Sequence, residues 1–191
     1  MSARLNHSLA NLVSALRIVL TVPFTWSVLV AARLGTGWLA AGLFALIAIS
    51  DFIDGRIARR TGTASAAGQV LDHGADIGFL LTAFGAYVAL GAVPWWVPAS
   101  IAAAFATYVV DSLRRSEQRP SLIGSRIGHA GGICNYALVG ILVGNYTVGL
   151  NWVPRPLMQA LFALVPLYSA ASIASRALAG PRRTALAAGR S

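Results

Sequence analysis

The sequence lacks lysine altogether and has little charge of either sign. Its 191 residues include 15 arginines, six acidic residues and one cysteine, and 11% are charged against 57% hydrophobic. A soluble domain carries about 25% charged residues, so an ordinary soluble fold is disfavoured, and the apolar content excludes a disordered chain. The single cysteine, Cys134, excludes a disulfide framework or a cysteine-based metal site. We interpret it as a small apolar helix residue.

Long segments of the chain contain no charged residue at all, namely residues 34–50, 77–110, 127–154 and 156–175. About 20 apolar residues cross the hydrocarbon core of a bilayer. The run 77–110 exceeds one crossing, and Gly91 and Pro94 supply the turn that divides it. We therefore predict an all-α integral membrane protein with six transmembrane helices, over residues 12–32, 37–54, 68–90, 95–113, 127–149 and 156–178.

The distribution of arginine predicts the orientation of these helices. With the N-terminus in the cytoplasm, 13 arginines lie on the cytoplasmic side and only Arg33 and Arg155 on the other. This asymmetry follows the positive-inside rule, so we expect both termini in the cytoplasm. We predict one six-helix domain over residues 1–180 and a basic, flexible tail over residues 181–191. We expect no nucleic-acid partner, because the sequence offers no soluble basic face with aromatic residues.

Four of the six acidic residues fall within 26 positions, near the ends of apolar helices. Asp51 and Asp54 are three residues apart, and Asp72 and Asp76 are four apart, so each pair projects from one helical face. A short polar link between the helices would bring the pairs together. Carboxylates at membrane depth are costly and usually functional. Cations are needed between converging carboxylates, and hard oxygen ligands favour Mg²⁺, Mn²⁺ or Ca²⁺ over zinc.

One divalent ion, or two about 4 Å apart, would clamp a diphosphate and neutralise charge on its departing half. The residues between the two acidic pairs suit such a ligand. Gly55 and Ala58 remove side-chain bulk where a ring or phosphate could approach, and Arg59 offers a planar fork of donors to phosphate. Taken singly, each glycine is better explained by close helix packing. The structural alternative for the carboxylates is pairing with Arg56, Arg59 and Arg60.

The spacing of these residues resembles the motif of the CDP-alcohol phosphotransferase (CDP-alcohol phosphatidyltransferase) family, D-x2-D-G-x2-A-R-x8-G-x3-D-x3-D. All eight defining positions match within residues 51–76, including the gap of eight residues between Arg59 and Gly68. A weaker similarity extends to Asn11, Ser14 and Arg17, which match the N-terminal N-x2-T-x2-R pattern of the family with Ser for Thr. The length of the chain and the six-helix prediction agree with the same family.

The resemblance implies transfer of a phosphoryl-alcohol group from a cytidine-diphosphate donor to an acceptor hydroxyl, with release of CMP. It also implies that Asp76 is the general base, which must lie within about 3 Å of the hydroxyl that it deprotonates. Mg²⁺ or Mn²⁺, as one ion or two, would be held by Asp51, Asp54, Asp72 and Asp76. The CDP moiety would be contacted by Asn11, Gly55, Ala58, Arg59, Ser65 and Gly68. Of these, Ser65 and Asn11 suit a cap or turn role equally well.

Two branches of this family compete as models for the substrates. The segment 50–55 and the Arg17 pattern look like the bacterial phosphatidylglycerophosphate and cardiolipin synthase branch, although Ile77 stands where a Lys is common there. The segments 58–62 and 71–76 look like choline and ethanolamine phosphotransferases, which use diacylglycerol as acceptor and are usually much longer. We therefore prefer CDP-diacylglycerol as the lipid donor and a small polar alcohol, glycerol 3-phosphate, as the acceptor. The resemblance further implies a homodimer among the lipids of the cell (inner) membrane, with a cytoplasmic active site.

The remaining polar residues have competing explanations. Four arginines crowd one cytoplasmic loop: Arg114, Arg115, Arg119 and Arg126. They are explained either by the positive-inside bias or by a pocket that binds a phosphorylated acceptor. We expect His129 and Asn135 to form hydrogen bonds between helices rather than to line that pocket, and His73 to face a neighbouring helix rather than act chemically.

Two other functional classes also use carboxylates in membrane helices. A Mg²⁺-dependent membrane prenyltransferase also combines Asp-rich motifs with a diphosphate, but it needs more helices and lacks the core of Gly55, Ala58 and Arg59. A cation transporter would place its carboxylates near the midplane and tends to show internal repeats. Here the carboxylates flank an Arg-rich turn instead. We therefore favour the transferase.

Overall fold

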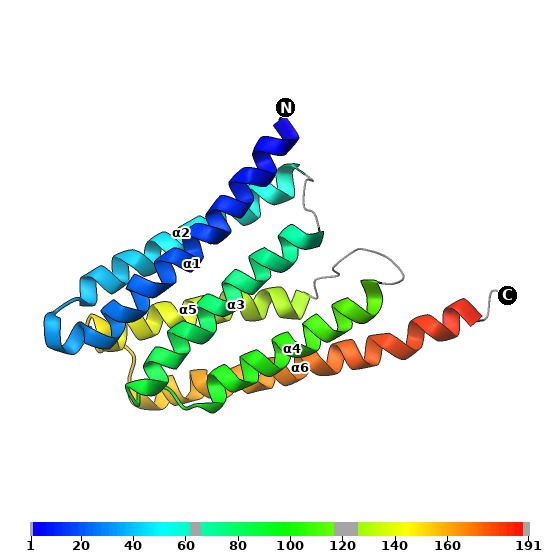
Figure 1. The fold of residues 1–191 in the computed structure, drawn as a ribbon. Coiled ribbons are helices and arrows are strands. Elements are labelled where there is room, and N and C mark those ends of the chain that lie inside the picture. The colour runs from blue at the N-terminus through cyan, green and yellow to red at the C-terminus, as the bar shows by residue number, and fades with distance from the viewer. Residues whose placement is uncertain (1, 62–65, 117–125, 189–191) are drawn as a thin grey trace.

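Helices make up nearly all of the computed structural model, which describes residues 2–61, 66–116 and 126–188, with side chains over 15–52, 73–110 and 130–175. The long helices run alongside one another as a bundle (Figure 1). The α-helices are α1 (Ser2–Leu34), α2 (Gly37–Thr61), α3 (Ala66–Ala89), α4 (Trp96–Ser116), α5 (Arg126–Leu142) and α6 (Arg155–Ala188). Each predicted span overlaps one of these helices, and the all-α prediction is confirmed. α6 continues past residue 180, and the predicted domain boundary there stays a prediction.

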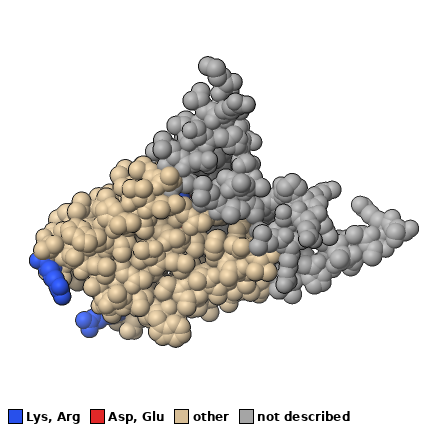
Figure 2. All heavy atoms as spheres, viewed as in Figure 1, with Lys and Arg blue, Asp and Glu red and all other residues tan. Residues whose placement is uncertain are grey.

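The described surface carries little charge and exposes many apolar side chains. Its exposed arginines are Arg33 and Arg155, and in the view of Figure 2 the blue side chains lie at one end of the molecule. Large apolar side chains such as Val22, Trp38 and Leu167 are exposed, and an apolar surface of this extent marks contact with a membrane or a partner. Within the described chain, two helical segments are long and apolar enough to cross a bilayer, Ala15–Leu34 and Arg155–Ser175, and Gly37–Phe52 and Trp96–Val110 are shorter apolar helices. The six-span topology stays a prediction.

An aromatic cluster joins the helices that carry the acidic motif. Phe24 of α1 and Phe79 of α3 have ring centroids 5.4 Å apart, and Phe44 of α2 lies 6.4 Å from each of them. Gly140 of α5 allows Phe44 this close, because a Cβ atom at that position would lie 2.9 Å from the Phe44 ring. Tilted and offset aromatic pairs of this kind contribute beyond the area they bury. The cluster therefore fixes α1, α2, α3 and α5 relative to one another.

The helix predicted over 127–149 changes geometry near its end. The α-helical part, α5, ends at Leu142, and the π-helix η1 (Val143–Thr147) follows it directly. The amide of Val148, the residue after η1, donates to the Val143 carbonyl at 2.8 Å. The buried Asn145 side chain binds both backbone groups of Val153, at 2.9 and 3.2 Å, and this pairing accompanies the wider turn. π-helices are rare and appear mostly as single turns within α-helices, and hydropathy alone does not predict them.

The connection from α1 to α2 depends on glycine at two positions. Gly35 adopts φ +65°, the left-handed conformation that suits glycine. A Cβ atom on Gly37 would lie 2.4 Å from the Thr147 carbonyl oxygen, so only glycine lets the start of α2 approach η1 this closely. Gly35 lies between the spans predicted over 12–32 and 37–54, and Gly37 is the first residue of the second span. The connection between α1 and α2 therefore packs directly against η1.

Candidate active site

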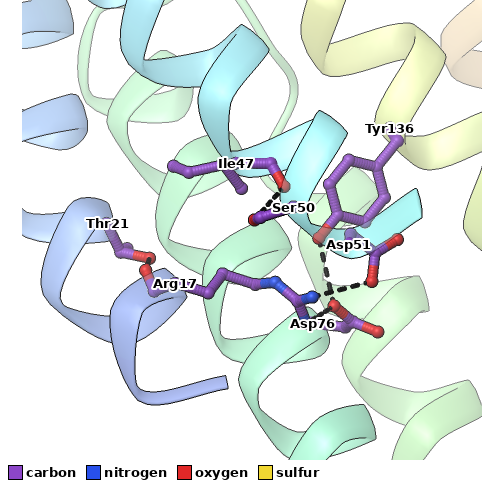
Figure 3. Close-up of polar contacts among 7 residues, drawn as sticks. All are labelled: Arg17, Thr21, Ile47, Ser50, Asp51, Asp76 and Tyr136. Carbon is purple, nitrogen blue, oxygen red and sulfur yellow. Dashed lines mark hydrogen bonds and ion pairs between the residues drawn. The ribbon is translucent and has the colours of Figure 1, made fainter. Parts of the chain in front are cut away.

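The centre of the candidate site is Arg17, a fully buried arginine of α1. Its side chain is 0% exposed, and its two terminal nitrogens bind different helices: Nη2 contacts Asp51 Oδ1 of α2 at 2.8 Å, and Nη1 contacts Asp76 Oδ1 of α3 (Figure 3). The planar guanidinium fork suits this double role, because each arm can align with its own carboxylate. One side chain thus brings together the first and the last carboxylate of the acidic motif.

The two carboxylates lie at a boundary between buried and accessible space. Side-chain exposure is 35% for Asp51 and 25% for Asp76, so a ligand can reach both oxygen-bearing groups. Burying a charged group away from water is costly unless a partner compensates it. Arg17 supplies that compensation within the apolar bundle, and the described trio keeps one net negative charge. The arrangement therefore stabilises converged carboxylates that remain partly accessible.

Tyr136 of α5 adds a neutral donor to this site. Its hydroxyl donates to Asp76 Oδ1 at 3.1 Å (Figure 3). Its ring stacks on Phe79, with centroids 5.5 Å apart and planes at 27°. The aromatic cluster below the site therefore sets the position of the hydroxyl. Asp76 thus accepts from both Arg17 and Tyr136 through the same carboxylate oxygen, Oδ1.

The remaining motif residues are placed only by their helices. Asp54, Gly55, Ala58 and Arg59 belong to α2, and Gly68 and Asp72 to α3. Asn11 belongs to α1, Arg114 and Arg115 to α4, and Arg126 begins α5. The side chains of all these residues, with that of His129, lie outside the described part of the chain, as do Ser65 and Arg119 altogether. Their predicted roles stay predictions.

The donor chemistry of the site fits a hard divalent cation. Asp51 and Asp76 converge on one positive group, and carboxylate oxygens are the ligands that Mg²⁺ and Mn²⁺ prefer. Among the described side chains no group of three or more metal-ligating residues occurs. Asp54 and Asp72, which would complete a set of four, lie outside those ranges.

Two of the weaker candidates have structural partners. The Tyr168 hydroxyl of α6 donates to Asn135 of α5, as expected for a hydrogen bond between helices. His73 of α3 stacks on Tyr108 of α4, with ring centroids 5.9 Å apart and planes at 20°. The preferred prediction for each residue, a contact with a neighbouring helix, agrees with these contacts.

Sequence reasoning missed two members of the site. It assigned Arg17 only to topology and to a family pattern, and it did not consider Tyr136 at all. The available signal for Arg17 was its position inside an apolar segment, where an arginine needs a buried partner. No comparable signal marks Tyr136, since buried tyrosines are common in helical bundles.

The described structure is a helical bundle with an apolar surface, in which two carboxylates converge on a buried arginine between the helices. The family follows from comparison with known sequences: residues 7–176 match the model of the CDP-alcohol phosphatidyltransferase family. The chain therefore belongs to that family. The prediction from the acidic motif is confirmed, and with it the predicted class, a transferase of substituted phosphate groups.

Similar proteins are known from mycobacteria. Proteins named "Putative cardiolipin synthase" from Mycobacterium bovis and Mycobacterium tuberculosis are 34% identical to this chain over 86 residues. The match covers 45% of this chain and 40% of each relative. These relatives are consistent with the bacterial branch that the segment 50–55 resembles.

Replacing Tyr136 with Phe tests its contribution to the site. The variant keeps the ring stacked on Phe79 and removes only the hydroxyl that binds Asp76. We expect kcat to fall about fivefold, the effect of losing one hydrogen bond of about 1 kcal/mol, with the KM for the donor little changed. Steady-state kinetics of CMP release measure both. Unchanged kcat would show that the hydroxyl does not position Asp76.

Proposed function

We propose that this protein transfers a phosphatidyl group from CDP-diacylglycerol to a small polar alcohol, glycerol 3-phosphate, and releases CMP. The observation that carries the proposal is the convergence of Asp51 and Asp76, the outer carboxylates of the family motif, on the buried Arg17. The family membership supplies the reaction class. The apolar surface supports a lipid substrate, because such a donor is delivered within the bilayer.

In the proposed reaction the acceptor hydroxyl oxygen bonds to the phosphorus of the phosphatidyl group. The bond from that phosphorus to the bridging oxygen breaks, and CMP leaves with the bridging oxygen. Asp76 takes the hydroxyl proton as general base, a role that demands contact at about 3 Å. Arg17 and Tyr136 hold one oxygen of Asp76, so the carboxylate is already oriented when the acceptor arrives.

We further propose that Asp51, Asp54, Asp72 and Asp76 hold divalent cations, Mg²⁺ or Mn²⁺. A bound ion would neutralise charge on the diphosphate and on departing CMP. Gly55, Ala58, Arg59, Gly68, Ser65 and Asn11 would contact the CDP moiety. The arginines at 114, 115, 119 and 126 would bind the phosphate of the acceptor.

Removal of divalent ions tests the metal proposal directly. We expect excess EDTA to stop CMP release, and added Mg²⁺ or Mn²⁺ to restore it, because the converged carboxylates would otherwise repel the diphosphate. The measurement is CMP release by the purified protein in detergent, before and after titration with each metal. Activity that persists in excess chelator contradicts the proposal.

The acceptor is tested with a panel. CDP-diacylglycerol is offered with glycerol 3-phosphate, inositol phosphate, inositol, serine or phosphatidylglycerol, and CMP and the lipid product are measured together. Phosphatidylglycerol is the second candidate, because the mycobacterial relatives carry the name of cardiolipin synthases. Activity only with CDP-choline or CDP-ethanolamine and diacylglycerol would instead assign the protein to the other branch.

The arrangement in the membrane is part of the same proposal. All six helices would cross the cell membrane, with both termini and the acidic motif at the cytoplasmic face and two copies forming a homodimer. The positive-inside asymmetry of the arginines supports this orientation. Reaction of single introduced cysteines with impermeant reagents, in a background without Cys134, tests the orientation.

A further inference from the structure

Arg17 supplies the candidate site with a positive charge that belongs to the chain itself. Its guanidinium contacts Oδ1 of Asp51 at 2.8 Å and also contacts Oδ1 of Asp76. Asp51 and Asp76 are the first and the last of the four carboxylates proposed to hold divalent cations. A metal ion that binds these two carboxylates therefore has to share them with the guanidinium.

The guanidinium is held firmly beside the carboxylates. Its side chain is 0% exposed, and arginine keeps its positive charge under all physiological conditions. Phe24 lies seven residues further along α1, on the same helical face, and packs against Phe44 of α2 and Phe79 of α3. Because this contact fixes α1, Arg17 cannot withdraw without separating α1 from the bundle.

The same aromatic cluster fixes both carboxylates. Asp51 follows Phe44 by seven residues on α2, and Asp76 precedes Phe79 by three residues on α3. These spacings place each carboxylate on the same helical face as its aromatic neighbour, one or two turns away. Apolar packing therefore brings the three charged groups together, in addition to their mutual attraction.

A divalent cation at the same carboxylates is repelled by Arg17. Two cations that bind one carboxylate are about 5 Å apart, since each lies about 2 to 3 Å from an oxygen. Even in bulk water, the repulsion between a divalent and a monovalent cation at about 5 Å weakens binding by more than about tenfold. Pre-organisation of the carboxylates by Arg17 acts in the opposite direction. The aromatic cluster already supplies much of that order, so repulsion is the larger effect.

We infer that Arg17 is a resident counter-ion that weakens the binding of divalent cations at Asp51 and Asp76, an inference that rests on the proposed function. Arg17 is a positioning residue, because it acts through the two carboxylates. Weaker binding mostly means faster release, so the residue also favours exchange of the bound ion. Removal of its charge should tighten metal binding, whereas removal of a merely structural residue would loosen it.

The test measures the binding of Mn²⁺ alone to the purified protein in a non-ionic detergent, without donor or acceptor. The EPR signal of unbound Mn²⁺ gives the Kd. We expect Arg17→Met to lower this Kd about tenfold, the size of the repulsion that it removes. Arg17→Lys keeps the charge, so its Kd should stay within about threefold of the wild-type value.

Two further variants control this measurement. Arg33→Met is the matched control, because Arg33 is an exposed arginine of the same helix. It lies about 24 Å further along α1, beyond the Debye length, and its removal should change the Kd less than about twofold. Asp51→Asn should raise the Kd, which shows that the Mn²⁺ measured is bound at this site.

An unchanged, raised or unmeasurably high Kd in Arg17→Met overturns the inference, because Arg17 would then not oppose metal binding. Equal tightening in Arg33→Met overturns it as well, since the net charge of the protein would then be the cause. If Arg17→Met does not fold, Arg17→Gln removes the charge, keeps a hydrogen-bond donor and takes its place. Failure of the metal proposal is seen separately, because no variant would then bind Mn²⁺ and EDTA would leave CMP release unchanged. Metal-dependent CMP release, with no tighter binding in Arg17→Met, refutes this inference alone.

Discussion

Asp76→Asn is expected to lower the rate of CMP release by at least about 100-fold, the smaller end of what a positioned general base contributes. The substitution removes the proton acceptor but keeps an oxygen that can accept from Arg17 and Tyr136, which bind this position. Stability should therefore change little, and donor binding should be largely retained. Single-turnover assays and binding of a CDP-lipid by the purified variant measure the two effects independently.

The control for this prediction is Asp111→Asn, which removes an acidic residue outside the eight-position motif. It should retain most of the activity. Near-normal turnover in Asp76→Asn would remove the general-base role from this residue. Loss of folding in Asp76→Asn, seen by thermal unfolding in detergent, would show that the residue is chiefly structural.

Arg17→Met should destabilise the protein by about 1–3 kcal/mol, the range for losing hydrogen bonds to charged groups. Methionine fills similar apolar space, but it leaves Asp51 and Asp76 beside each other without the guanidinium that contacts both. We expect the unfolding temperature to fall by several degrees. The fall should be larger in EDTA than in Mg²⁺ if cations bind the same carboxylates.

Two further variants show whether the loss comes from this particular pairing. Arg33→Met removes an exposed arginine from the other end of α1 and should leave the unfolding temperature nearly unchanged. Arg17→Met combined with Asp51→Asn should be less destabilised than the sum of the two single variants, as expected for residues in direct contact. Strict additivity in this cycle would contradict a functional ion pair between α1 and α2.

The sequence predicts those parts of the fold that depend on local composition or on the spacing of residues along a helix. Charge-free segments locate the helices because hydrocarbon excludes ionised groups, and glycine and proline locate the turns. The spacing of Asp72 and Asp76 places two carboxylates on one helical face without knowledge of the neighbours. For the same reason the motif 51–76 is enough to recognise the family.

The parts that sequence does not predict depend on contacts between distant residues. Arg17 is 34 residues from Asp51 and 59 from Asp76, and Tyr136 is 60 residues from Asp76. Nothing in their local sequence specifies these partners, since they follow from the packing of α1 and α5 around α2 and α3. The π-helix is similar, because it accompanies the pairing of Asn145 with the backbone of Val153.

The ion pairs of Arg17 also bear on how the protein is assembled. Small metal-binding domains often cannot fold until the ion arrives, since their ligands have no other partner. In this bundle a positive charge that belongs to the chain already lies between two of the carboxylates. The packing of these helices therefore has a source of charge compensation within the chain itself, which does not have to be supplied by a bound ion.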